Sequence, residues 1–388
     1  MDYKKESMKL HQDLKGKLEI KARAKTDTKE ALALAYTPGV AEACLAIKEN
    51  PEEAFHLTRK WNLVAVVTDG TAVLGLGDIG PMAGMPVMEG KAVLFKNFAD
   101  VDAFPLCLGT KDPEEIIQTI KNFAPTFGGI NLEDIKAPKC FEIEQRLTEE
   151  LDIPVFHDDQ HGTAIVVLAA ILNSLKLVGK SLDSCKVVIS GAGAAGMAIL
   201  HLLQLEGAKD VTFVGRKGII GPDYYPDPYR QKMLATCNPR KVQGGMEEAL
   251  TGADIFIGVS GPGLVTTDMV KKMNKDAIVF AMANPIPEIY PDEAKAGGAR
   301  VCGTGRSDFP NQVNNVSVFP GFFRGALDVR AKRITDNMKL AAAHAIADSV
   351  DNPREDYVLP DAFDLQVAHR IAKAIGDQAR KDGVARIQ

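Results

Sequence analysis

The sequence predicts a two-domain α/β protein, and three observations support this prediction. The chain has 388 residues, which is more than one hydrophobic core usually holds. From residue 185 onward, apolar runs and helical stretches alternate, which predicts a doubly wound parallel sheet. The N-terminal half contains candidate strands and helices of its own. We therefore divide the chain into residues 1–160 and residues 161–388, the second ending in a helical tail.

The first 50 residues are expected to be largely helical. Residues 1–28 are polar and rich in lysine, and this composition fits either a solvated helix or an arm that reaches a partner subunit. Thr37 as N-cap and Pro38 at the first helical position predict a helix that ends near Ile47. Tyr36 would then lie just before the positive end of that helix.

The rest of the N-terminal half is expected to mix strands and helices. Apolar runs at 62–68 and 72–76 flank Asp69-Gly70, which favours a β-hairpin. Asp112 is a typical N-cap, followed by a first-turn proline and two acids, and predicts a helix as far as Phe123. The other elements expected here are helices at 88–96 and 139–151, strands at 126–132 and 153–156, and a buried helix at 164–172.

The C-terminal half has a more regular pattern. Strands are expected near 185–190, 210–214, 254–258, 277–282 and 299–302, and tail helices at 318–332, 335–349 and 361–380.

Composition excludes several classes of protein. The formal net charge of −5 gives no electrostatic reason to expect nucleic acid or an anionic membrane as a partner. The longest apolar run, 164–172, is much shorter than the roughly 20 residues that a membrane-spanning helix needs. The six cysteines form no Cys-x-x-Cys pair, and the N-terminus lacks the apolar core of a secretory signal. We therefore expect a cytoplasmic protein with no membrane or nucleic-acid partner.

A glycine fingerprint indicates a dinucleotide site. The apolar strand ending at Ser190 runs into Gly191-Ala192-Gly193-Ala194-Ala195-Gly196, and a helical segment and a second strand follow on schedule. Gly191 permits the tight turn, Gly193 lets a pyrophosphate approach the backbone, and Gly196 lets helix and strand pack closely. This context predicts a Rossmann-like domain that binds its ligand at a helix N-terminus.

The second strand of that domain bears on which dinucleotide binds. An NAD site usually ends this strand with an acid that bonds the ribose 2′-hydroxyl. Here the strand ends in Gly215, followed by Arg216 and Lys217, which could pair with a 2′-phosphate. The pattern favours NADP over NAD, although surface cations at a turn are the alternative interpretation.

Three acids, Glu133, Asp134 and Asp159, lie at the ends of predicted strands and form an oxygen-donor set suited to Mg²⁺ or Mn²⁺. Neighbouring strand residues point to opposite faces, so Glu133 and Asp134 can both bind a metal only if the strand has ended. For each acid the alternative is a helix cap or a solvated side chain, and we prefer that alternative for Asp158.

Histidines offer a second, weaker metal hypothesis. His157 and His161 have the spacing of a zinc pair, but the zincin glutamate is missing and a strand ending at His157 would break the helical face. Lys91 is a candidate general base, because a partly desolvated lysine near a cation loses its proton more readily. Lys96 is the rival candidate on the same segment.

Taken together, these segments resemble the malic enzyme family, specifically its short bacterial form. The matching segments are Tyr36-Thr-Pro-Gly-Val40, Val67-Thr-Asp-Gly70, Leu74-Gly-Leu-Gly-Asp-Ile-Gly80, Glu89-Gly-Lys91, Asn131-Leu-Glu-Asp134, Phe156-His-Asp-Asp-Gln-His-Gly-Thr163, Gly191-Ala-Gly-Ala-Ala-Gly196, Ala283-Asn-Pro285 and Asn314-Asn315. The resemblance implies a malic-enzyme-type catalytic domain in residues 1–160 and a dinucleotide-binding domain in residues 161–388.

The resemblance also implies roles for individual residues. Tyr36 would be the general acid and Lys91 the general base, with Glu133, Asp134 and Asp159 as metal ligands. Asn284 and Asn315 would contact substrate or nicotinamide. Larger members carry an arginine two residues after the Asp-Gly turn to hold a substrate carboxylate. This chain has Thr71-Ala72 there instead, which leaves open what binds that carboxylate.

The activity implied is metal-dependent oxidative decarboxylation of malate to pyruvate and CO₂ with reduction of NADP or NAD. Two alternatives are a malolactic-type decarboxylase that releases lactate and a catalytically silent nucleotide-binding protein. We expect a homodimer, the default for a soluble enzyme, and no additional C-terminal acyltransferase domain.

Overall fold

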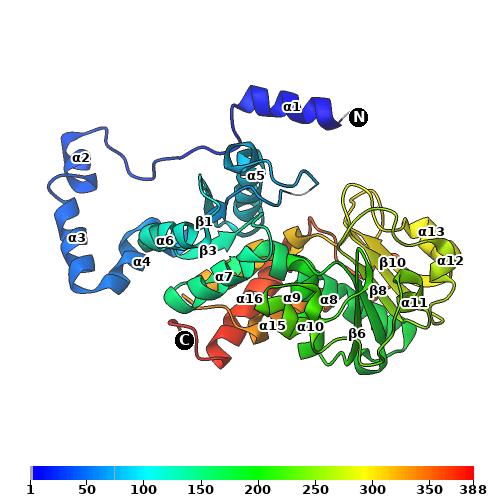
Figure 1. Ribbon diagram of the computed structural model, residues 1–388. Coiled ribbons are helices and arrows are strands. Elements are labelled where there is room, and N and C mark those ends of the chain that lie inside the picture. The colour runs from blue at the N-terminus through cyan, green and yellow to red at the C-terminus, as the bar shows by residue number, and fades with distance from the viewer. Residues whose placement is uncertain (1–2, 74) are drawn as a thin grey trace.

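The computed structural model describes residues 3–73 and 75–388, which form two parallel sheets with helices packed around them (Figure 1). The first sheet has the order β2-β1-β3-β4 and is parallel throughout. Its strands are β1 (Leu63–Thr68), β2 (Asp102–Cys107), β3 (Gly129–Leu132) and β4 (Val155–His157). The carboxyl ends of β3 and β4 are neighbours, because Leu132 pairs with His157.

The second sheet has the order β10-β9-β8-β5-β6-β7. Its strands are β5 (Lys186–Ser190), β6 (Asp210–Gly215), β7 (Gly218–Ile219), β8 (Ile255–Gly258), β9 (Ala277–Ala281) and β10 (Ala299–Thr304). All pairs are parallel except the short β6–β7 pair. The chain runs outward from β5 in both directions, so the doubly wound arrangement is confirmed. Its switch point, where such sheets bind ligands, lies between β5 and β8.

Helices surround both sheets. They are α1 (Tyr3–Leu14), α2 (Lys29–Ala35), α3 (Val40–Glu49), α4 (Ala54–Leu57), α5 (Pro81–Ala99), α6 (Pro113–Phe123), α7 (Lys139–Glu150), α8 (Asp158–Val178), α9 (Ala194–Leu205), α10 (Pro228–Leu234), α11 (Met246–Leu250), α12 (Thr267–Val270), α13 (Pro291–Ala296), α14 (Phe319–Asp328), α15 (Asp336–Ala347) and α16 (Leu365–Lys381). Short 3₁₀ turns occupy 51–53, 59–62, 124–126, 182–184, 222–224 and 315–317.

The two sheets are joined through α8 and share one hydrophobic core. This helix begins at Asp158 and continues to Val178, so the division expected at residue 160 falls within its first turn. The C-terminal helices return to the first sheet: Phe319 and Phe323 of α14 pack edge-on against Phe95 of α5, at ring separations of 4.7 and 5.3 Å. The tail therefore contacts both halves, because α14 packs against α5 while Asp336 of α15 lies 2.7 Å from His201 of α9.

The N-terminal helices form an arm that projects from the body (Figure 1). None of the described residues of α1, α2 or α3 is buried. The arm is fixed where Lys17 bonds to α5, its backbone N–H donating to the Glu89 carboxylate at 3.0 Å and its Nζ to the Pro86 carbonyl at 2.6 Å. Both sequence interpretations of residues 1–28 remain compatible with this exposed helix.

Two segments of the described chain are long and apolar enough to pass a membrane-span test based on length and hydropathy alone. One is α8, which is largely buried as the core helix between the sheets. The other is Lys29–Glu49, which has none of its residues buried and is interrupted between α2 and α3. This second segment is apolar but uncovered by its own chain.

Two local predictions were wrong, and one strand was missed. The hairpin at 62–76 does not form, because β1 pairs in parallel with β2 and β3 instead of with the following residues. The strand β2 was not predicted. The helix expected to begin at Pro38 begins at Val40 with Gly39 as N-cap, and Tyr36 is the C-cap of α2.

Candidate active site

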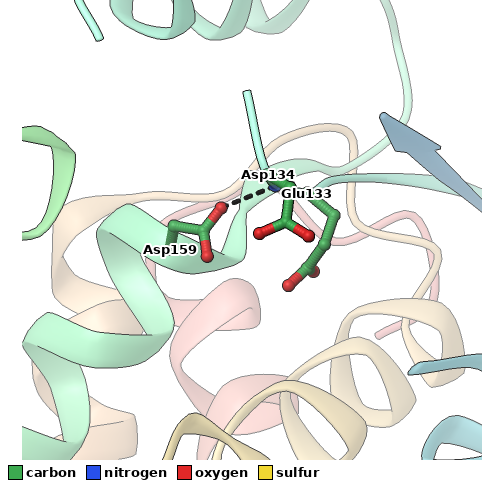
Figure 2. A group of neighbouring side chains, drawn as sticks. All are labelled: Glu133, Asp134 and Asp159. Carbon is green, nitrogen blue, oxygen red and sulfur yellow. Dashed lines mark hydrogen bonds between the residues drawn. The ribbon is translucent and has the colours of Figure 1, made fainter. Parts of the chain in front are cut away.

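Three carboxylates meet where β3 and β4 end (Figure 2). Glu133 and Asp134 follow β3 directly, and Asp159 lies in the first turn of α8, directly after β4. One oxygen from each lies within 4.8 Å of the others, and the Asp134 backbone N–H donates to Asp159 Oδ2 at 2.7 Å. Because β3 ends at Leu132 and Asp134 has a positive φ of 55°, Glu133 and Asp134 escape strand alternation and can face the same space.

The electrostatics of this acidic cluster favour a bound cation. Burial raises the pKa of Glu133 to about 7, although Lys91 opposes the shift. Burial and the charges of Asp159 and Glu133 raise the pKa of Asp134 to about 9. Asp134 Oδ2 is buried and has no hydrogen-bond partner in the described chain. Closely spaced, desolvated oxygen donors of this kind fit Mg²⁺ or Mn²⁺.

The cluster has an open side. Asp159 has a side chain that is 33% exposed, whereas Glu133 and Asp134 are buried. Burial and the neighbouring Asp158 raise the pKa of Asp159 above its ordinary value, but solvent also reaches this carboxylate. A cation and a small substrate therefore have access from the Asp159 side.

Lys91, in α5, lies beside the cluster and is itself buried. Its Nζ is 2.6 Å from Asp158 Oδ2, 3.0 Å from Glu133 Oε1 and 4.1 Å from the centre of the Phe319 ring. Burial lowers the pKa of Lys91, but Asp158 and Glu133 outweigh it and hold the pKa above its usual range. These two acids therefore favour the ammonium form of Lys91, and loss of its proton beside a bound divalent cation stays a prediction.

The rival lysine, Lys96, is placed elsewhere. Its side chain is about half exposed and pairs with Asp100 and Asp102 at the far end of α5. The structure therefore brings Lys91, and not Lys96, to the carboxylates.

Asp158 was wrongly expected to be a cap or a solvated acid. Its side chain is completely buried and forms the shorter of the two ion pairs with Lys91. Burial raises the pKa of Asp158 to about 7, although Lys91 opposes this. Because Asp158 and Asp159 occupy adjacent helical positions, their side chains diverge, one toward Lys91 and the other toward Asp134.

His157 and His161, the alternative metal pair, have different surroundings. His157 ends β4 and its ring is buried, whereas His161 in α8 contacts the Glu144 carboxylate at 2.9 Å. The two histidines therefore lie in different elements, a strand and a helix.

Tyr36 is not brought to this cluster by its own chain. It lies on the exposed arm between α2 and α3, which project away from β3 and α8 (Figure 1). Its side chain is 67% exposed. Of the two candidate proton-transfer residues, one is therefore buried beside the carboxylates and the other is open to solvent.

The glycine fingerprint has the expected geometry. Gly191 has a φ of 106°, and a Cβ on Gly196 would lie 1.9 Å from the Gly191 carbonyl oxygen. A Cβ on Gly193 would meet nothing within 4 Å, which leaves room for a ligand. Gly193 is the N-cap of α9 and has no side chain to satisfy the first N–H groups, so Ala194 and Ala195 present free donors to an anion.

The edge of the dinucleotide domain is positively charged. Arg216 and Lys217 form the exposed turn between β6 and β7. Arg230 of α10 stacks on the Tyr225 ring at 3.6 Å, and its Nη1 lies 3.5 Å from the Ala192 carbonyl oxygen of the glycine loop. A Cβ on Gly215 would lie 2.9 Å from the buried Ile220 side chain, so this strand end has no room for a larger residue without rearrangement.

The two asparagines predicted to contact substrate or nicotinamide lie in different elements. Asn284 follows β9 and precedes a cis proline, and its carbonyl oxygen lies 3.9 Å from where a Cβ on Gly75 would stand. Asn315 begins a 3₁₀ turn. A Cβ added to Gly162 would lie 3.1 Å from the Asn315 Cβ and would also contact the Asp158 side chain. Asn315 is therefore near the Lys91–Asp158 pair, and Asn284 lies where the two halves meet.

Comparison with known proteins identifies the family. Residues 15–148 match the N-terminal domain of malic enzymes, and residues 160–380 match the malic enzyme NAD binding domain. The chain belongs to the malic enzyme family. Members of this family decarboxylate malate, and the resemblance seen in the sequence is confirmed.

Individual relatives cover almost the whole chain. It is 57% identical over 96% of its length to the NAD-dependent malic enzyme of Geobacillus stearothermophilus, covering 78% of that protein. It is 54% identical over its full length to the bifunctional malic/malolactic enzyme of Bacillus subtilis, covering 95% of that protein. Among solved structures, malic enzyme from Pyrococcus horikoshii matches with a TM-score of 0.93 and 51% identity, over 96% of this chain and 88% of that one.

Proposed function

We propose that this protein oxidatively decarboxylates malate to pyruvate and CO₂, reducing NADP or NAD with a divalent cation bound. The observation that supports this most directly is the placement of Glu133, Asp134 and Asp159 beside Lys91. Family membership supplies the substrate and the reaction type. The glycine loop supplies the place for the dinucleotide, which provides the hydride acceptor.

The acidic cluster would hold Mg²⁺ or Mn²⁺ through Glu133, Asp134 and Asp159. When bound, such a cation supplies Lewis-acid stabilisation to oxygens of the substrate. Asn131 supports this arrangement, since its Nδ2 donates to Glu133 Oε2 at 2.8 Å and holds the carboxylate beside Lys91.

Proton removal from the C2 hydroxyl of malate is assigned to Lys91 acting with Asp158. Lys91 must give up its own proton before it can accept another. Asp158 is the nearer of its two carboxylate partners, at 2.6 Å, and is the proposed acceptor of that proton. The amide groups of Asn284 and Asn315 are the proposed contacts to substrate or nicotinamide, in the absence of an arginine at Thr71-Ala72.

Protonation of C3 of enolpyruvate is assigned to Tyr36 of a second subunit. Tyr36 is exposed on an arm whose apolar side chains, including Leu34 at 80% exposure, are uncovered. The N-terminal half of α5 has a matching uncovered surface, where Met82 is 85% and Val87 41% exposed. Val87 lies one helical turn before Lys91, so an arm packed there would reach the acidic cluster. In a two-fold symmetric homodimer, the arm of each subunit would cover the exposed α5 surface of the other.

We propose NADP as the preferred coenzyme. An acid that bonds the ribose 2′-hydroxyl would occupy position 215, where a side chain meets Ile220. Arg216 provides positive charge at the same edge, and Arg230, which pairs with Asp227 at 2.6 Å, lies against the glycine loop. Relatives of both kinds exist, since the Geobacillus stearothermophilus protein is called NAD-dependent and a 48% identical malic enzyme of Haemophilus influenzae NADP-dependent.

The test is reduction of NADP⁺ and NAD⁺ by purified protein with malate, with Mn²⁺ and with a chelator. We expect pyruvate and reduced coenzyme in equal amounts, a higher kcat/KM with NADP⁺, and no turnover with the chelator. Chelator-resistant turnover would contradict the metal assignment.

A malolactic reaction is the second candidate, because the Bacillus subtilis relative is named for both activities. In that reaction the coenzyme is reoxidised and lactate leaves. Lactate formed without net reduction of coenzyme would favour it.

A further inference from the structure

Glu144, in α7, lies outside the acidic cluster but contacts the helix end that carries it. Its Oε1 accepts a hydrogen bond from the His157 backbone N–H at 2.9 Å. Its Oε2 accepts one from Gln160 Nε2 at 3.0 Å and contacts His161 Nε2 at 2.9 Å. A single carboxylate therefore binds three groups in the last residue of β4 and the first turn of α8.

The three partners of Glu144 flank Asp158 and Asp159 in the sequence. His157 precedes the acidic pair, and Gln160 and His161 follow it, so both sides of the pair are held from one point. The acids face away from Glu144, toward Lys91 and the Asp134 backbone N–H. The direction of both side chains thus depends on how this first turn is held.

Glu144 stays charged although it is only 13% exposed. Burial would raise its pKa, but the neighbouring His161 and Lys339 hold the pKa at about 2. An ionised carboxylate facing the N-terminus of α8 also interacts favourably with the helix dipole. Its contacts with the turn are therefore charge-assisted and short.

We infer that Glu144 is a positioning residue for the metal site, holding the first turn of α8 so that Asp159 reaches Asp134 and Asp158 reaches Lys91. This inference rests on the proposed function. It assigns Glu144 no contact with metal or substrate. Groups that orient metal ligands in this way change metal affinity or activity by about 10- to 100-fold when removed.

The test compares Glu144→Gln with Glu142→Gln. In E144Q an amide NH₂ group replaces one carboxylate oxygen. This group cannot accept from the N–H donors that it faces, so at least one hydrogen bond is lost. Glu142 lies two residues earlier in α7 and has a side chain that is 57% exposed. Within the described chain its carboxylate has one ion-pair partner, Arg146, at 3.9 Å. Mn²⁺ binding is titrated without malate or dinucleotide, and NADPH binding is measured by its fluorescence.

We expect E144Q to bind Mn²⁺ about 10- to 100-fold more weakly, with an NADPH Kd within twofold of wild type. E142Q should match wild type in both measurements. A purely structural defect would lower the folded fraction or weaken both ligands together, so the split between Mn²⁺ and NADPH identifies positioning. In turnover, E144Q should lose kcat and require more Mn²⁺ while its KM for the coenzyme stays unchanged.

Gln160→Leu provides a second variant if E144Q does not fold. This variant removes one of the three contacts. Its Mn²⁺ Kd should lie between those of wild type and E144Q. If E144Q cannot be measured, the Kd of Q160L should still be above that of wild type. A folded E144Q or Q160L with an unchanged Mn²⁺ Kd would overturn the positioning role alone. If wild type itself bound no Mn²⁺, the metal assignment and the positioning role would both fall.

Discussion

Two residues are proposed to transfer protons: Lys91 beside the acidic cluster, and Tyr36 on the N-terminal arm. Their surroundings are opposite in burial. Lys91 is buried, contacts Asp158 and Glu133, and packs against Phe319. Tyr36 is exposed, on helices with no buried residue among those described. One half of the site is complete within a single chain. In our proposal the other half is completed by the surface of a second subunit, which makes assembly part of the proposed mechanism.

The largest effect is expected from Lys91→Ala, which tests the buried half. Loss of a general base should lower kcat by about 10²- to 10⁴-fold. The variant also leaves Asp158 and Glu133 buried without their cation, which typically costs about 3–5 kcal/mol when a buried ion pair is broken. Turnover and thermal unfolding, measured with Mn²⁺ present, would show both effects.

Lys96→Ala is the matched control for that prediction. This exposed lysine lies on the same helix and pairs only at the surface, where ion pairs contribute little to stability. It should keep wild-type turnover. Near-normal kcat in a folded Lys91→Ala protein would remove Lys91 from the mechanism.

Complementation between inactive variants tests the exposed half. We expect Tyr36→Phe and Lys91→Ala each to lose most activity. If Tyr36 acts in the neighbouring subunit, random mixing gives half mixed dimers, each with one intact site, so about a quarter of wild-type activity should return. If Tyr36 acts within its own chain, every site in the mixture carries one defect. Activity measured after mixing unfolded chains and refolding distinguishes the two, with size-exclusion chromatography to establish the dimer.

Elements were predicted correctly where the information lies in contiguous residues, and incorrectly where it lies in residues far apart in the sequence. The strand β5, the glycine loop and α9 are contiguous, so their pattern determined their structure and the role of each glycine. The hairpin at Asp69-Gly70 failed because β1 is a central strand, and its partners come from residues about 40 and 65 positions later. The edge strand β2 was missed because Pro105 interrupts its pattern, and edge strands are where proline is tolerated.

The candidate site was predictable in its residue types but not in its distances. Glu133, Asp134 and Asp159 were found because acids at parallel strand ends converge. Asp158 was misjudged because its partner, Lys91, is 67 residues away, and two adjacent acids look alike in a sequence. Glu144 gave no signal at all, since an acid on an amphipathic helix is normally solvated. The exposure of Tyr36 could not be derived from residues around it.

Arg216→Ala tests a second exposed region, the turn between β6 and β7. Like the arm, the turn after β6 is uncovered, and we propose that the coenzyme phosphate completes it. The variant should lower the kcat/KM ratio of NADP⁺ over NAD⁺ by about tenfold, the worth of one charge-assisted contact. Binding of 2′,5′-ADP should weaken while binding of 5′-AMP does not change. Lys271→Ala removes an exposed cation directly after α12 and serves as control. An unchanged ratio in Arg216→Ala would argue against NADP recognition there.

The smallest effect concerns the stability of the metal-free protein. Glu133, Asp134 and Asp158 have pKa values of about 7, 9 and 7, above those of unfolded carboxyl groups. Such groups bind protons more tightly when folded. Their contribution to stability is therefore complete below the unfolded pKa and is lost as pH rises through the folded values. Without metal, Tm should fall between pH 6 and 8.5.

A divalent cation should reverse that trend, because it binds the ionised carboxylates and no longer competes with protons at high pH. The rise in Tm caused by Mg²⁺ should therefore be larger at pH 8.5 than at pH 6, at about 1 °C per kcal/mol of stabilisation for a chain of 388 residues. Asp134→Asn removes the acid with the most raised pKa and should flatten both dependences. A Mg²⁺ shift that stayed constant with pH would mean that the buried carboxylates are not the groups that bind the ion. Lys91 and the carboxylates would then form a site that needs no cation, and they would differ from the arm only in how they are packed.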